Sequence, residues 1–233
     1  MDDFQKFLTL EPEKRERIIN AAMTEFLHGF KKASTDNIVR EAGISKGLLF
    51  HYFGTKERLF NFLIDYAIDT VKAEYLDLVN IYQPDILDSI WQSSLLKKDL
   101  SVRFPSIFDF LTNSYVEAKT GVGVATDNLE RFTQMSDKII TEIYAHADTS
   151  LFRDDIDKKA AMNIIGWTMS GYSHAKIMES GENPGADARE NYDQYLEEFE
   201  KILGVLRQVF YKKTKVESGE PESINYKLKE VTV

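Results

Sequence analysis

Helix start and stop signals are concentrated in residues 34–60, and this feature most constrains how the chain can fold. Three N-cap residues alternate there with two glycines that favour the end of a helix: Ser34, Gly43, Ser45, Gly54 and Thr55. Each pair of signals leaves room for only about two turns of helix. The stretch therefore predicts two very short helices, joined by tight turns and followed by the start of another helix.

Apolar residues recur at helical spacing over most of the remaining chain. A helix is expected around residues 12–28, because one apolar stripe runs through Ile18, Ile19, Ala22, Met23, Phe26 and Leu27. After Thr55 a long helix should continue to about residue 80. Further helices are predicted at roughly 84–101, 105–118, 125–146, 156–179 and 187–212, with a turn-rich break at 180–185. Only the end of the tail, 213–233, alternates like a strand, and we expect that tail to be mobile or to lie on the surface. The predicted fold class is all-α.

Composition excludes several classes of protein. The 233 residues are enough to bury a core, and 43% are hydrophobic and 29% charged, as in globular proteins. Cysteine is absent, which excludes disulfides and thiolate metal sites. No apolar run approaches the roughly 20 residues needed to cross a bilayer, and no signal peptide is evident. A cytoplasmic location without membrane association is expected.

Charge divides the chain into two parts. The net charge is −9, but residues 1–58 carry ten Lys and Arg against nine Asp and Glu, a net of +1. The rest of the chain therefore carries −10. An acidic polymer would be repelled by the acidic body, which would leave the near-neutral N-terminal region to face it.

The short helices of 34–60 have the geometry of a helix-turn-helix, in which the second helix places its N-terminal residues at base edges in the major groove. Gly43 allows the turn, and Gly47 would let the recognition helix approach DNA closely. Ser45, Lys46 and Gly47 are expected at the exposed start of the recognition helix, and Leu48, His51 and Tyr52 on or near its DNA side. Leu49, Phe50 and Phe53 should face inward.

Two helix starts are suited to phosphate binding, because free backbone N–H groups there favour an anion. Thr35 lies at one of them, and Lys56 lies at the other, where it adds a positive charge. Caps and glycines also occur in any helical bundle, so on pattern alone a bundle with short connecting helices remains an alternative.

Residues 14–60 resemble the DNA-binding region of the TetR (tetracycline-repressor) family of bacterial regulators. The resemblance rests on four matches in register: Ile18-Ile19-x-Ala21-Ala22-x-x-x-Phe26, Ser34-Thr35 with Ile38-Val39-x-x-Ala42-Gly43-Ile44-Ser45-Lys46-Gly47, Phe50-x-Tyr52-Phe53, and Thr55-Lys56-Glu57-x-Leu59. It implies phosphate contacts by Thr35, Tyr52 and Lys56, and positions at or near the bases for Ser45, Lys46, Gly47, Leu48 and His51. Leu48 departs from the family pattern, which more often has a small polar residue there. Leucine cannot hydrogen-bond a base edge, but it can pack on a thymine methyl.

For the chain as a whole the resemblance implies two domains and a tail, 213–233. Residues 1–58 would form a three-helix helix-turn-helix domain, and a long fourth helix would join it to an all-helical ligand-binding and dimerisation domain, 59–212. The protein would be a sequence-specific transcriptional regulator, a repressor that a small-molecule ligand releases from a near-palindromic operator in double-stranded DNA. It would form a homodimer through its last two long helices. The alternative is a helical protein–protein adaptor or a ligand sensor that does not bind DNA.

A largely apolar ligand is expected in a cavity among the central helices. Its candidate lining is aromatic: Trp91, Phe104, Phe108, Phe110, Tyr115, Phe132, Trp167 and Tyr172. An aromatic stripe at helical spacing can equally be plain core.

No catalytic signature occurs in the chain, so an enzyme is not predicted, and neither are catalytic residues, cofactors or metal ligands. Asp154-Asp155-x-Asp157 is an acidic cluster, but it lies where a helix N-cap is expected.

Overall fold

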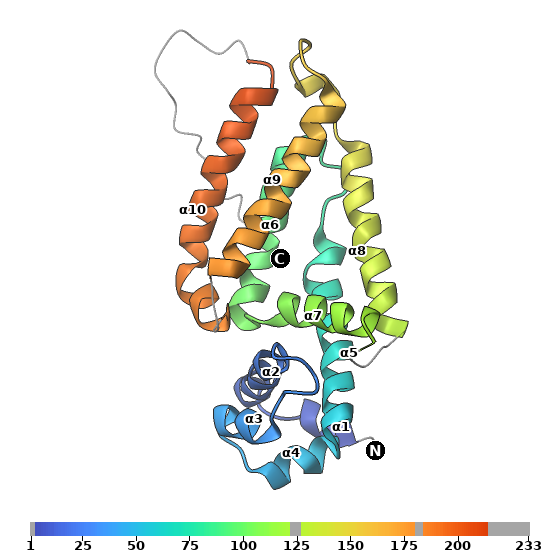
Figure 1. The fold of residues 1–233 in the computed structure, drawn as a ribbon, viewed down its shortest axis with the longest axis vertical. Helices are drawn as coiled ribbons and strands as arrows, with labels where there is room; N and C mark the ends of the chain where they lie inside the picture. The colour runs from blue at the N-terminus through green and yellow to red at the C-terminus, as the bar shows by residue number, and fades with distance from the viewer. Residues whose placement is uncertain (1–2, 122–126, 180–183, 214–233) are drawn as a thin grey trace.

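The computed structural model describes residues 3–121, 127–179 and 184–213, and in these ranges the chain is all-α, as predicted (Figure 1). Its ten α-helices are α1 (Asp3–Leu8), α2 (Pro12–Phe26), α3 (Thr35–Ala42), α4 (Lys46–Phe53), α5 (Lys56–Glu74), α6 (Ile86–Arg103), α7 (Ile107–Lys119), α8 (Asp127–His146), α9 (Lys158–Glu179) and α10 (Pro184–Phe210). Two 3₁₀ turns, Leu76–Leu78 and Thr149–Leu151, complete the described elements. No described helix is long and apolar enough to span a membrane.

The predicted caps form the short helices. Three side-chain oxygens accept backbone N–H groups: Ser34 Oγ from Asn37 at 3.4 Å, Ser45 Oγ from Leu48 at 3.1 Å, and Thr55 Oγ1 from Arg58 at 3.1 Å. Both stop glycines have positive φ angles, +65° at Gly43 and +71° at Gly54. Side chains rarely adopt such angles, so glycine is required to end these two helices so sharply.

A short helix that the periodicity did not reveal, α1, precedes the predicted ones. Six residues are too few to show a helical repeat. Its Phe7 is fully buried and lies 4.9 Å from Phe53 of α4, ring centre to ring centre. The helix-turn-helix region therefore rests on α1 as well as on α2.

Two apolar cores stabilise the molecule. The larger runs without interruption from α1–α4 through α5 into α7 and the start of α8, and its members include Phe7, Phe60, Phe110 and Leu129. The smaller joins α6, α9 and α10 at the far end, around Phe152, Ile165 and Phe199. Because the larger core continues past residue 58, the predicted division between 1–58 and 59–212 does not coincide with a gap in packing, and it stays a prediction.

Helix α5 is shorter than predicted. It ends at Glu74 rather than near residue 80, because Tyr75 leaves the helical conformation and its hydroxyl hydrogen-bonds Ser93 of α6 at 2.7 Å. Helix α10 instead begins earlier than expected, with Pro184 in its first turn, a position that proline tolerates. The predicted strand-like tail lies outside the described residues, and so does most of the predicted break at 180–185.

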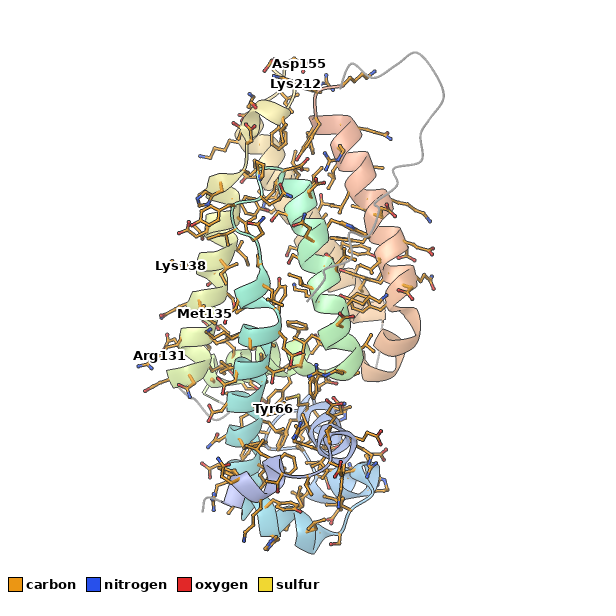
Figure 2. The ribbon with its side chains drawn as sticks, turned by 180° about the vertical axis from the view of Figure 1, so that it is seen from behind. Tyr66, Arg131, Met135, Lys138, Asp155 and Lys212 are labelled. Atoms are coloured by element: carbon orange, nitrogen blue, oxygen red, sulfur yellow. The ribbon has the colours of Figure 1, made fainter. Side chains whose placement is uncertain are left out.

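The helices are arranged around α7, which lies across the molecule between α2–α4 on one side and the upright α6, α8, α9 and α10 on the other (Figure 1). Helix α5 runs upward from the helix-turn-helix, and Tyr66 lies at this junction (Figure 2). Asp155 and Lys212 mark the opposite end of the molecule (Figure 2). Helices α5 and α7 therefore connect the two ends.

Candidate nucleic-acid interface and ligand cavity

Helix α4 presents an exposed N-terminus. Ser45, Lys46 and Gly47 are all exposed, and a Cβ placed on Gly47 would meet no atom within 4 Å. On its other face Leu49 and Phe53 are each 1% exposed. The helix is therefore anchored by its apolar face and leaves its first turn free to contact a large partner.

The remaining α4 positions differ in how far they can reach that partner. His51 is exposed and Leu48 is half-buried, packed partly against the core. Tyr52 is only 8% exposed, with its ring edge-on to Phe7 at 5.6 Å. Sequence placed Tyr52 on or near the DNA side, but most of this side chain belongs to the core. Its hydroxyl accepts and donates no hydrogen bond within the described part of the chain, so that group remains free to contact a partner.

The two predicted phosphate-binding helix starts lie beside α4. Thr35 is the first residue of α3 and is half-buried. The Lys56 ammonium donates to the Ala33 carbonyl at 2.9 Å and lies 4.9 Å from the centre of the Phe30 ring. Lys56 therefore ties the α2–α3 loop to the start of α5, in addition to any contact with a phosphate.

An ion pair links the first turns of α3 and α4. Lys46 Nζ lies 2.8 Å from Asp36 Oδ1, and both side chains are at least half exposed. Behind them, Glu25 of α2 accepts the Ser34 N–H at 2.7 Å and the Asn37 side-chain amide at 3.3 Å. Arg17 Nε donates to the Ala42 carbonyl at 2.9 Å. Both ends of α3 are thus held by side chains of α2.

Polar contacts join the helix-turn-helix to the rest of the protein along α2. Thr24 and Ser106 share a hydrogen bond at 2.9 Å, and the Phe30 N–H donates to Glu117 Oε2 at 3.1 Å. Arg103 binds Glu74 through two nitrogens, at 2.9 and 3.0 Å, and lies 3.3 Å from Glu16. A displacement of α7 would therefore move α2.

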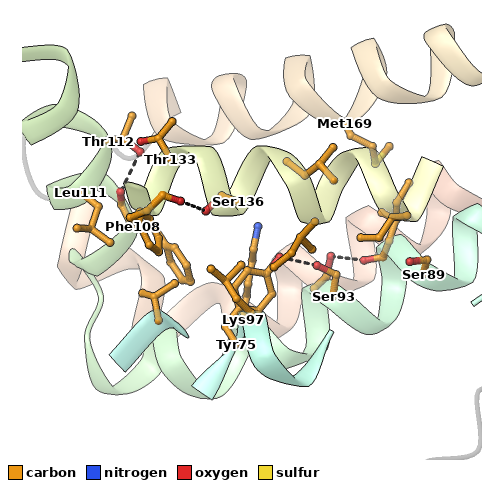
Figure 3. Close-up of a pocket in the computed structure, with 18 of the residues that line it drawn as sticks. Tyr75, Ser89, Ser93, Lys97, Phe108, Leu111, Thr112, Thr133, Ser136 and Met169 are labelled. Carbon is orange, nitrogen blue, oxygen red and sulfur yellow. Dashed lines mark hydrogen bonds between the residues drawn. The ribbon is translucent and has the colours of Figure 1, made fainter. Parts of the chain in front are cut away.

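A cavity of about 500 Å³ lies above α7, among α5, α6, α8, α9 and α10 (Figure 3). Three of the eight predicted aromatic residues line it, Phe108, Tyr115 and Phe132. Its volume is in the range of small-molecule sites. The lining is mainly apolar, with Leu111 and Ile139 beside these rings.

The structure places the other five aromatic residues elsewhere. Phe104 and Phe110 belong to the main core, at 0% and 1% exposure. Trp91 packs against the second core. Tyr172 does not line the cavity itself, although it stacks on Tyr195 and Phe199, which do. Trp167 is 72% exposed. Helical spacing shows that residues share a face but not what that face meets, so we leave these five out of the proposed site.

Polar lining residues were missed by the sequence analysis. Ser93 and Lys97 of α6 and Ser136 of α8 contribute to the cavity wall. The sequence does contain Ser89, Ser93 and Lys97 at four-residue spacing, which puts them on one helix face. Polar residues at such spacing usually mark a solvated face. Only the packing of α6 against its neighbours shows that this face lines a cavity.

The acidic cluster at 154–157 serves local structure. Asp157 Oδ1 accepts the backbone N–H groups of Lys159 and Ala160 at 2.9 and 3.0 Å, at the start of α9. Asp155 pairs with Arg153. In the described ranges no three His, Cys, Asp or Glu residues gather in a way that could hold a metal ion.

Comparison with known proteins agrees with this geometry. The model of the family described as bacterial regulatory proteins, tetR family, matches residues 18–62, from α2 to α5. The HTH-type transcriptional regulator BetI of Agrobacterium fabrum is 34% identical over 70 residues, which are 30% of this chain and 31% of that protein. The chain thus matches about a third of the length of this relative.

Two solved structures share the fold over nearly the whole length. A TetR family transcriptional regulator from Chloroflexus aurantiacus has a TM-score of 0.58 and 18% identity, over 90% of this chain and 98% of that one. The TetR family protein CprB from S. coelicolor A3(2) has a TM-score of 0.51 and 21% identity, over 87% and 90%. Residues 18–62 thus match the tetR family model, and the chain as a whole shares the all-helical fold of these two regulators.

Proposed function

We propose that the protein is a sequence-specific DNA-binding regulator, acting as a dimeric repressor that a small molecule releases from its operator. The observation that carries this proposal is the exposed N-terminus of α4 on a helix-turn-helix that matches the family over residues 18–62. Lys46, Gly47, Leu48 and His51 would meet base edges from this turn. Ser45 would lie beside them.

Phosphates would be held at the flanks of α4. Thr35 sits at the start of α3. The Lys56 ammonium has three N–H groups and approaches two carbonyls, that of Ala33 at 2.9 Å and that of Lys31 at 3.5 Å, so one N–H is left for a phosphate. The free hydroxyl of Tyr52 would be the third phosphate contact. These contacts would set the register, and the α4 side chains would read the sequence.

Dimerisation is supported by an exposed apolar strip on α9 and α10. Ile164 and Trp167 of α9 are 40% and 72% exposed, and Val205 and Val209 of α10 are 58% and 47% exposed. Such large apolar side chains are costly to leave in water and are typical of an interface. A second copy could cover them by pairing its own α9 and α10, giving a four-helix bundle with two-fold symmetry.

Release from DNA would pass through α5 and α7, because both helices reach the two sites. Helix α5 begins at Lys56, and its Val71 lines the cavity. Helix α7 lines the cavity with Phe108 and holds the helix-turn-helix with Glu117. A ligand that favours one position of these helices would change the separation of the two recognition helices. It can do so only by its difference in affinity for the two states, typically about 1–3 kcal/mol.

The test is selection of bound sequences from a random duplex DNA library, followed by mobility-shift titration of the selected site. Wild type should prefer that site to unrelated DNA by at least about a thousandfold. Lys46→Met and Tyr52→Phe should abolish or strongly weaken the shift. Lys138→Met removes an exposed charge of α8 that lies far from α4 (Figure 2) and should leave it unchanged. Failure to enrich any sequence would instead support an adaptor or a sensor that does not bind DNA.

A further inference from the structure

The cavity contains a charge that the protein itself does not neutralise. Among the lining residues that the structure describes, Lys97 is the only one with a charged side chain, and no aspartate or glutamate joins it. Its ammonium lies 5.0 Å from the centre of the Tyr75 ring and 5.6 Å from that of Phe108. No carboxylate, carbonyl or hydroxyl oxygen in the described ranges accepts a hydrogen bond from it. Figure 3 shows this ammonium pointing into the pocket between α6 and α8.

Such a cation needs a partner. An ammonium in mostly apolar surroundings loses part of its hydration, and cation–π contacts restore only part of that free energy. The neighbouring residue provides a contrast, because Lys98 is bound to Asp193 at 2.6 Å on the surface. Lys97 therefore differs from the nearby lysine in having three unused N–H donors, and these donors point into a cavity.

Several hydroxyl groups of the lining, unlike the Lys97 ammonium, have no hydrogen left to donate to a ligand. Four of them donate their hydrogen to the carbonyl four residues earlier in their own helix: Ser94 to Ile90, Thr112 to Phe108, Thr133 to Leu129, and Ser136 to Phe132. A hydroxyl that has spent its hydrogen can only accept from a ligand. The Lys97 ammonium is thus the strongest donor in the described lining and the group best suited to an anion.

We propose that the cavity binds an amphipathic molecule with a single anionic group, such as a carboxylate, which pairs with Lys97. The apolar body of this ligand would lie against Phe108, Phe132 and Ile139, and any further polar groups would be donors facing Ser94 and Ser136. A molecule with several charges would leave all but one unpaired, since the described lining holds no second cation. This inference rests on the proposed ligand-binding role of the cavity and specifies its ligand class.

Two fluorescent probes that differ in charge test the proposal. Anilinonaphthalene sulfonate carries one negative charge, whereas phenylnaphthylamine has the same aromatic body without it. Wild type should bind the sulfonate at least about tenfold more tightly, since a charge-assisted hydrogen bond in a partly buried site contributes that much or more. Lys97→Met should remove this preference and leave binding of the neutral probe within about twofold of wild type. Lys97→Arg should retain the preference, and the matched Lys98→Met should change neither affinity.

Two further readouts make the outcomes distinguishable. Ile139→Trp fills the cavity and should weaken both probes, which shows that they bind there. Unchanged neutral-probe binding by Lys97→Met shows that the variant still folds. Equal affinity of wild type for the two probes, or an equal loss of both in Lys97→Met, would overturn the proposed ligand class while the cavity remained a binding site. Binding of neither probe would overturn the cavity as a ligand site as well. Operator binding, measured separately, would be untouched by either result.

Discussion

At the scale of single residues, two side chains of the proposed recognition surface have partners within the chain that would compete with DNA. Lys46 is paired with Asp36, and Lys56 is bound to the Ala33 carbonyl. An exposed ion pair contributes little free energy, typically under about 1 kcal/mol, so a phosphate can replace Asp36 at low cost. The buried contacts of α4 remain unchanged in such an exchange.

Leu48 is the residue at which sequence preference should depart from the family pattern. It is half-buried at the edge of the α4 surface, so its side chain can pack on a thymine methyl but cannot hydrogen-bond a base. Leu48→Ala should reduce discrimination at one operator base pair by about 1 kcal/mol. Titration of single-base operator variants measures this, with Leu78→Ala as a control because Leu78 is 58% exposed and lies outside the helix-turn-helix. Identical base preferences in wild type and Leu48→Ala would contradict it.

Lys56 should contribute equally to the affinity for all DNA sequences. If its ammonium contacts one phosphate, Lys56→Ala weakens specific and unrelated DNA equally and reduces the slope of log affinity against log salt by about one unit. The structural bond to Ala33 makes the slope a better measure than the affinity. A loss of affinity with an unchanged slope would assign Lys56 to holding the α2–α3 loop rather than to a phosphate.

At the scale of elements, the start of α6 is held by a network that reaches α10. Asp85 caps α6 and also accepts from Arg207 at 2.6 Å and from the Tyr211 hydroxyl at 2.7 Å, and Arg207 binds Asp88 at 2.6 Å as well. Burial alone would raise the pKa of Asp85, but the hydrogen bonds from Arg207 and Tyr211 outweigh it, so that pKa lies below its ordinary value. For Asp88, burial and the charge of Asp85 raise the pKa.

The charge of Asp85 should therefore stabilise the fold at neutral pH. Since its folded pKa is lowered, this stabilisation is present above the unfolded value of about 4 and is lost as pH falls through the folded pKa. Asparagine is also a good N-cap, so Asp85→Asn removes the charge and keeps the cap. At pH 7 it should lower the free energy of unfolding by about 2 kcal/mol, and the difference from wild type should shrink in acid.

Chemical denaturation at several pH values measures this effect. Asp88→Asn is the matched control, and it should cost less, because the raised pKa of Asp88 means that keeping it ionised at pH 7 is already unfavourable. An Asp85→Asn variant as stable as wild type at pH 7 would show that the network contributes no net stability.

At the scale of the whole molecule, the cavity and the helix-turn-helix lie at opposite faces of α7, and the exposed apolar strip lies on α9 and α10. The proposed dimer would cover this strip and would thereby define the spacing of its two recognition helices. The acidic body, with its −10 charge after residue 58, would keep other surfaces away from DNA.

Trp167→Glu should therefore give a folded monomer with weakened operator binding. A charge at the centre of an apolar interface would be buried without a partner, which strongly opposes association. Light scattering should give twice the chain mass of 26.8 kDa for wild type and about the chain mass for the variant. Tyr82→Glu is the control, since Tyr82 is 70% exposed and precedes α6. A wild-type monomer at micromolar concentration would contradict the proposed interface.

The local structure could be predicted from residues that lie close together in the chain. Ser34, Ser45 and Thr55 each accept from a backbone N–H three residues later, and Gly43 and Gly54 adopt positive φ angles. The short helices could therefore be located from these residues alone. The helix-turn-helix and the exposed start of α4 followed from them. Such signals need no knowledge of distant contacts.

The surroundings of each helix face could not be predicted in this way, because they depend on tertiary packing. Phe108 and Phe110 lie two residues apart, yet one lines the cavity and the other packs with Phe26 in the core. Trp167, expected in the pocket, is exposed, and Lys97 points into the pocket beside aromatic rings. Helical periodicity identifies which residues share a face. Whether that face meets core, cavity or solvent depends on the packing of helices far apart in the chain.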